Sequence, residues 1–120
     1  MTDEARPGVL VVDDDELLRV ALGSALRRAG FTTHLAASGP EALDLYRRQG
    51  GIGAVLLDVS MPEMTGPQTL AALRAVNPAV RCCLMSGYDT QDVRGLGDDF
   101  LLKPFLLDEA VDVLWRLVGR

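Results

Sequence analysis

The chain has 120 residues, of which 48% are apolar, enough to fill the core of one small domain. Its net charge of −5 and the scattered positions of its twelve Lys and Arg residues argue against direct nucleic-acid binding by this chain. No apolar stretch approaches the ~20 residues of a membrane span, and residues 1–7 lack the apolar centre of a signal peptide, so we expect a cytoplasmic protein that does not bind membranes.

Strand and helix patterns alternate along the chain. Short apolar runs bounded by turn-forming residues predict strands, and apolar residues at helical spacing predict helices. In chain order, the sequence predicts a strand over 9–12, a helix over 16–29, a strand over 31–36, a helix capped by Ser38 that runs to Arg48, a strand over 54–57, a helix over 66–76, a strand over 80–85, little more than one helical turn within 89–94, a strand over 100–102, and a helix from 108 to 118.

This alternation predicts one α/β domain over residues 8–120, after a flexible tail over residues 1–7. Its fold is expected to be a three-layer sandwich, in which helices cover both faces of a doubly wound, five-stranded parallel sheet. Gly and Asp residues crowd the segment over 87–99, and they disfavour a long helix there. The fourth helix is therefore expected to be shortened.

Polar residues stand at the ends of four of the five predicted strands. Asp13 and Asp14 follow the first strand, Asp58 the third, Ser86 the fourth and Lys103 the fifth. The carboxyl ends of parallel strands meet at one edge of the sheet, so these side chains are expected to form one site. Clustered carboxylates repel one another unless a cation lies between them, and Mg²⁺ best fits oxygen ligands of this kind. A metal, a hydroxyl and an ammonium group together predict chemistry on a phosphoryl group.

The motifs around these residues resemble those of response-regulator receiver domains. Four motifs occur in the order typical of that family, and the resemblance extends from residue 9 to about residue 118. They are VVDDDE with Asp13 and Asp14, LLDVSMPEMTG with Asp58, LMSGY with Ser86, and LLKPF with Lys103. The resemblance implies a flavodoxin-like sheet with strand order 2-1-3-4-5 and a role in two-component signalling, as a phosphoacceptor and not as an enzyme.

The resemblance also implies what the acidic residues do. Asp58 would accept a phosphoryl group from the phosphohistidine of a histidine kinase or a histidine phosphotransfer protein. Mg²⁺ would be held by Asp14, Asp58 and the backbone carbonyl of Ser60, while Asp13 would act mainly through a metal-bound water. Lys103 would pair with Asp58 or with the phosphate.

Further residues would switch or modulate the site. Ser86 would move to hydrogen-bond a phosphate oxygen, and Phe100 occupies the position of the switch aromatic of receivers. Tyr88 lies where family members control the access of water to the acyl phosphate, whereas Ser60 is small and would offer less shielding. The residues expected to modulate the site are Ser60, Gly87, Tyr88 and Pro104, the last resembling the family's cis proline that aims Lys103 inward.

Two other functions fit parts of the sequence. Asp13 and Asp15 match the DxD pattern of haloacid-dehalogenase-type phosphatases. Those enzymes place a lysine before a later acidic pair, whereas Lys103 follows the pair at 98–99, and Asp58 would have no role. A degenerate receiver that serves as a binding scaffold is the other alternative, but such proteins typically lose a site residue and this chain retains all of them.

Several other residues have simpler interpretations. Asp15 is expected to cap the helix that comes after it. Cys82 and Cys83 are predicted to be reduced thiols on opposite faces of a buried strand. His34 is expected on the surface of an edge strand, and residues 98–99 are expected to form a solvated turn.

The cognate kinase and the output of the chain stay open at this point. The chain begins with Met1 and is either a stand-alone receiver or a piece of a larger protein. The shortened fourth helix removes apolar area from the face through which receivers usually pair, so we expect a monomer.

Overall fold

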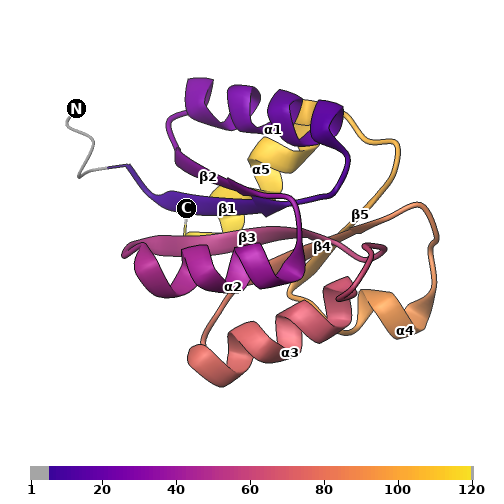
Figure 1. The fold of residues 1–120 in the computed structure, drawn as a ribbon. Helices are drawn as coiled ribbons and strands as arrows, with labels where there is room; N and C mark the ends of the chain where they lie inside the picture. The colour runs from indigo at the N-terminus through magenta and orange to yellow at the C-terminus, as the bar shows by residue number, and fades with distance from the viewer. Residues whose placement is uncertain (1–5, 120) are drawn as a thin grey trace.

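Strands and helices alternate throughout the computed structural model, which describes residues 6–119 (Figure 1). In chain order, the elements are β1 (Gly8–Val12), α1 (Glu16–Arg28), β2 (Thr32–Ala36), α2 (Gly39–Arg48), β3 (Ile52–Asp58), α3 (Gly66–Val76), β4 (Cys82–Ser86), α4 (Gln91–Arg94), β5 (Asp99–Leu102) and α5 (Leu107–Leu117). None of the helices within residues 6–119 is long and apolar enough to cross a membrane.

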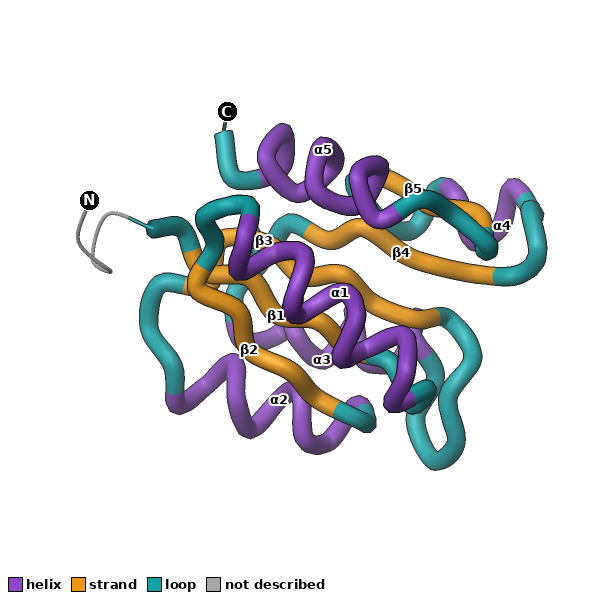
Figure 2. Tube along the Cα trace, turned by 90° about the horizontal axis from the view of Figure 1, so that it is seen from above, coloured by secondary structure: helices purple, strands orange, loops and turns teal. Residues whose placement is uncertain are grey.

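The five strands form one parallel sheet in the order β2-β1-β3-β4-β5. Helices α1 and α5 cover one face of the sheet, and α2, α3 and α4 cover the other, as Figures 1 and 2 show from two directions. The predicted three-layer fold and its strand order are therefore confirmed. The fourth helix is a single turn without a buried residue, as the sequence also predicted.

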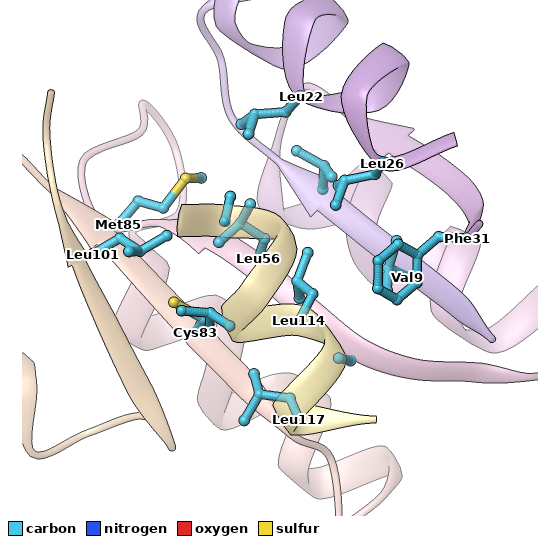
Figure 3. Packing of buried hydrophobic residues seen from close by; sticks show 14 residues of the cluster. Val9, Leu22, Leu26, Phe31, Leu56, Cys83, Met85, Leu101, Leu114 and Leu117 are labelled. Carbon is cyan, nitrogen blue, oxygen red and sulfur yellow. The ribbon is translucent and has the colours of Figure 1, made fainter. Parts of the chain in front are cut away.

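Two apolar cores lie on the two faces of the sheet. Val9, Leu56 and Cys83 face α1 and α5, whereas Leu57 and Cys82 face α2 and α3. Figure 3 shows the first core, where side chains of the sheet meet those of α1 and α5. Because successive strand residues point to opposite faces, a strand buried on both sides must be apolar throughout, which explains the uninterrupted apolar runs in the sequence.

The two cysteines lie as predicted, on opposite faces of β4 with both thiols free and buried. Burial raises the pKa of the Cys82 thiol to about 12, and the nearby charge of Asp98 also acts to raise it. Burial also raises the pKa of Cys83. Because the thiolate is the reactive form, both groups are chemically inert core residues.

Local polar contacts set the ends of several helices. The carboxylate of Asp15 accepts hydrogen bonds from the backbone N–H groups of Leu17 and Leu18, which confirms its predicted role as the cap of α1. Thr65 and Gln68 form a reciprocal capping box at the start of α3. The capping box therefore determines where the loop after Asp58 ends and α3 begins.

The expected solvated turn at residues 98–99 is confirmed for Asp98, which is exposed and lies in a bend, and is wrong for Asp99. The Asp98 carboxylate accepts a hydrogen bond of 2.8 Å from the backbone N–H of Cys82, which begins β4. Asp99 is the first residue of β5, and its carboxylate lies 3.2 Å from the guanidinium of Arg116 in α5. The start of β4 leaves a backbone donor that needs an acceptor, and the Asp98 carboxylate supplies it.

Other strand boundaries differ from the expected ones by one or two residues. The sequence predicts that Phe31 begins the second strand, but Phe31 precedes β2 and is fully buried, with its ring centroid 4.2 Å from that of Trp115. His34 lies on the edge strand β2, as expected, with a half-buried side chain.

We predict that Gly66→Ala destabilises the fold. A Cβ atom at Gly66 would lie 2.4 Å from the carbonyl oxygen of Asp58, because the loop after β3 folds back tightly and the Gly66 N–H bonds to Val59. Overpacking of this kind costs ~1–3 kcal/mol of unfolding free energy, measurable by urea denaturation. Gly87→Ala is the matched control, since its Cβ would meet nothing within 4 Å, and an equal loss in both variants would contradict the prediction.

Candidate functional site

Three carboxylates gather where β1 and β3 end at the same edge of the sheet. The two strands are paired in register, with Val12 beside Leu57, so the residues that come next are neighbours. Asp13 and Asp14 come directly after β1, and Asp58 is the last residue of β3; each offers a carboxylate oxygen within 4.8 Å of the others. Asp13 is fully buried and Asp58 is 4% exposed, whereas Asp14 is exposed.

Every polar group of Asp13 has a partner. Its carboxylate accepts hydrogen bonds from the backbone N–H of Asp15, at 2.8 Å, and from the ammonium of Lys103, at 3.0 Å. Its backbone N–H donates to Ala36 in β2, and its carbonyl oxygen accepts from the guanidinium of Arg19 at 2.8 Å. These contacts offset the cost of burying a carboxylate.

Lys103 lies between two of the carboxylates. Its ammonium nitrogen is 3.0 Å from Asp13 and 3.2 Å from Asp58. The peptide between Lys103 and Pro104 is cis, as the resemblance implied, and the backbone N–H of Lys103 bonds to Ser86 at the end of β4. Burial alone lowers the pKa of Lys103, but the hydrogen bond to Asp13 and the charge of Asp58 outweigh burial and raise it. Lys103 is therefore charged.

The same surroundings leave Asp58 short of positive charge. Burial, followed by the charge of Asp13, raises the pKa of Asp58 from 3.8 to about 6, although Lys103 and the N–H of Ser60 act in the opposite direction. One ammonium group does not neutralise three carboxylates. Oxygen ligands with an excess of negative charge are those that a hard divalent cation prefers, so the cluster fits Mg²⁺.

Ser86 lies at the end of the strand next to β3, and Tyr88 contacts Ser86. Ser86 is the buried last residue of β4, one position beyond Met85, which pairs with Asp58. The Ser86 hydroxyl oxygen accepts a hydrogen bond of 3.0 Å from the backbone N–H of Tyr88. The Tyr88 side chain itself is 74% exposed.

Phe100 has a partner that sequence reasoning missed. The Arg94 guanidinium, on the short helix α4, lies 4.9 Å from the centroid of the half-buried Phe100 ring. Two further bonds join this guanidinium to the carboxylate of Asp89. The contact of Arg19 with Asp13 was missed as well. No motif signals either contact, because each depends on where a long side chain meets a distant group in space.

A family model for the response regulator receiver domain matches residues 9–114. The chain belongs to this family. Receiver domains are signalling domains of two-component systems, and the acidic cluster fits their phosphorylation site. The haloacid-dehalogenase-type alternative loses its support, since the second acid of its DxD pattern, Asp15, caps α1 in this receiver.

Relatives of this receiver occur in proteins of different kinds. It is 41% identical over 118 residues to the sensor kinase CckA of Brucella abortus, covering 93% of this chain and 12% of that protein. It is 38% identical over 124 residues to the transcriptional regulatory protein PrrA of Mycobacterium tuberculosis, covering 99% of this chain and 53% of that protein. The receiver therefore spans about half or less of these relatives.

A solved structure of similar fold is that of the response regulator TrrA from Thermotoga maritima in complex with Mg²⁺ and a beryllium fluoride. The TM-score is 0.81 with 27% sequence identity, and the match covers 92% of this chain and 98% of that one. Receiver domains bind Mg²⁺ at an acidic pocket of the kind that Asp13, Asp14 and Asp58 form here.

The raised pKa of Asp58 predicts a pH-dependent effect of Asp58→Asn. Asp58 binds its proton more tightly in the folded state, where its pKa is about 6, than in the unfolded state, where it is 3.8. Stability therefore falls as the pH rises through this window and stays low above it. In metal-free buffer at neutral pH the substitution should raise the unfolding free energy by roughly 1–3 kcal/mol.

Urea denaturation at several pH values measures this effect. The gain from Asp58→Asn should shrink steadily as the pH falls from about 6 to 3.8, because the wild-type carboxyl group becomes neutral over that range. A gain that did not depend on pH would mean that better packing, and not relief from buried charge, stabilises the variant.

Proposed function

We propose that this receiver accepts a phosphoryl group on Asp58 from a histidine kinase or a histidine phosphotransfer protein in the cytoplasm. The observation that carries the proposal is the place of the Asp58 carboxylate, beside two further acids and 3.2 Å from the ammonium of Lys103. A carboxylate nucleophile next to positive charge is the arrangement that phosphoryl transfer requires.

The position of each acid supports Asp58 as the acceptor. Both carboxylate oxygens of Asp13 already accept hydrogen bonds, and its side chain is fully buried. Asp14 is exposed, and the ion pairs of Lys103 go to the other two acids. The Asp58 carboxylate has the ammonium group of Lys103 nearby, and contacts with the protein compensate its negative charge only in part.

The transfer itself is a displacement at phosphorus. One carboxylate oxygen of Asp58 forms a bond to phosphorus, while the bond from phosphorus to the donor's histidine nitrogen breaks and that nitrogen keeps the electron pair. Asp14, Asp58 and the backbone carbonyl of Ser60 would hold Mg²⁺, with Asp13 acting mainly through a metal-bound water. When bound, Mg²⁺ supplies the positive charge that three carboxylates and a phosphoryl group require.

Four other residues would take part in binding the phosphoryl group or in shaping the site around it. Lys103 would pair with the phosphoryl oxygens, and Ser86, whose oxygen accepts a bond from Tyr88 N–H, retains its own proton to donate to the phosphate. The Tyr88 ring would restrict the access of water to the acyl phosphate. Gly87, which has open space around it, leaves the backbone between Ser86 and Tyr88 free to adjust.

The output of the receiver would run through protein contacts or through onward transfer of the phosphoryl group. Relatives include a sensor kinase and transcriptional regulators, so a partner domain could bind DNA where such a domain exists. The net charge of −5 does not favour nucleic-acid binding by the receiver itself.

Replacement of Asp58 by Asn should abolish phosphorylation. Acetyl phosphate and Mg²⁺ should label the wild type and not the variant, as intact-mass spectrometry or phosphate-affinity electrophoresis would measure. Asp15→Asn is the matched control: it removes a carboxylate from the same edge, but Asn caps helices as well as Asp does, so labelling should persist.

The pair of variants also separates the receiver chemistry from that of a DxD-type phosphatase. Such a phosphatase requires Asp13 and Asp15, so loss of labelling in Asp15→Asn with retention in Asp58→Asn would overturn the proposal. Labelling of both variants at the wild-type level would place the acceptor elsewhere.

We also expect the activated receiver to remain a monomer. The single turn of α4 buries no residue, so little apolar area from this helix is available to a dimer interface. Light scattering in the presence of Mg²⁺ and beryllofluoride measures the mass in the activated state. A stable dimer formed only with beryllofluoride would show that β5 and α5 suffice for pairing.

A further inference from the structure

We propose that Arg19 is a positioning residue of the Mg²⁺ site. This inference rests on the proposed function, since it concerns how the two acids after β1 are held. Arg19 lies in the first turns of α1, and its guanidinium donates a 2.8 Å hydrogen bond to the backbone carbonyl of Asp13. This bond reaches neither a carboxylate nor any atom that reacts.

The carbonyl that Arg19 binds belongs to the peptide that joins Asp13 to Asp14. Among residues 6–119, the exposed Asp14 carboxylate has no hydrogen bond or ion pair of its own. Its position therefore depends on the backbone that carries it. The orientation of the peptide that Arg19 holds sets the direction in which the Asp14 side chain leaves the chain.

Other contacts anchor different atoms of this loop. The Asp13 N–H donates to Ala36 in β2, and the Asp13 carboxylate accepts from the Asp15 N–H. Arg19 alone, within the described part of the chain, supplies a side-chain donor to the peptide between the two acids. A charged donor to a carbonyl is stronger than a neutral one, and the planar guanidinium fixes its direction.

A purely electrostatic role and a positioning role predict opposite changes in Mg²⁺ affinity when Arg19 is removed. A nearby positive charge repels Mg²⁺, so deleting the guanidinium would tighten metal binding if charge alone mattered. Loss of positioning frees Asp14 and weakens binding instead. The sign of the change in Mg²⁺ affinity therefore separates the two roles.

The test compares Mg²⁺ titrations of the full chain, monitored by amide chemical shifts in ¹⁵N-labelled protein. Arg19→Met keeps the aliphatic stem and removes the donor, and Arg19→Ala removes both. We expect each to bind Mg²⁺ roughly tenfold or more weakly, as is typical when a residue that orients a metal ligand is lost. Arg28→Ala is the matched control, because this exposed arginine of the same helix bonds to Ser24, away from the site, and its loss should leave the affinity unchanged.

Phosphorylation gives a second readout that a merely structural defect would not reproduce. At saturating Mg²⁺ the rate of labelling of Arg19→Met by acetyl phosphate should return to the wild-type value, because Asp58 and Lys103 keep their contact. Unchanged or tighter Mg²⁺ binding by Arg19→Met would overturn the role of Arg19. Absence of Mg²⁺ binding by the wild type would instead overturn the proposed function.

Discussion

The site depends on how one ammonium group is shared between two buried carboxylates. Lys103 lies 3.0 Å from Asp13 and 3.2 Å from Asp58, and both acids are withdrawn from water. Burial, followed by the charge of Asp13, raises the pKa of Asp58 to about 6, because the single positive charge of Lys103 does not compensate two negative ones in a medium of low dielectric constant. That deficit of positive charge makes the site receptive to a cation.

Apolar burial on both faces of the sheet stabilises the fold and offsets the cost of the uncompensated charge at the site. All five residues of β1 and of β4 are buried, and both faces of the sheet carry an apolar core. The cost of uncompensated charge is confined to one edge, where the strands end and the helices begin. A fold of this kind tolerates unbalanced charge at one edge because the burial of apolar side chains elsewhere does not depend on it.

Contacts that follow from strand order could be predicted from the sequence, whereas contacts between a side chain and a distant backbone atom could not. The positions of Asp13, Asp58 and Lys103 could be predicted from strand periodicity and strand order, since strand ends of a parallel sheet must meet at one edge. Asp98 could not be placed, because its acceptor role depends on which backbone donor at the start of β4 lacks a partner. Arg19 was missed for the same reason: the atom it binds is a backbone carbonyl, and a carbonyl has no sequence signature.

Few contacts hold the segment that links the site to the short helix. The Tyr88 N–H bonds to the Ser86 hydroxyl, and Arg94 joins Asp89 to the ring of Phe100. α4 contributes no fully buried side chain, and its apolar contact with the core is the half-buried Val93. Under the proposed function, a shift of Ser86 toward a phosphoryl group would break the bond to Tyr88, and the surface contacts of Arg94 would offer little resistance to a movement of α4. On this proposal, a displacement at the site would reach the surface mainly through a few polar contacts, with Val93 as the apolar contact between α4 and the core.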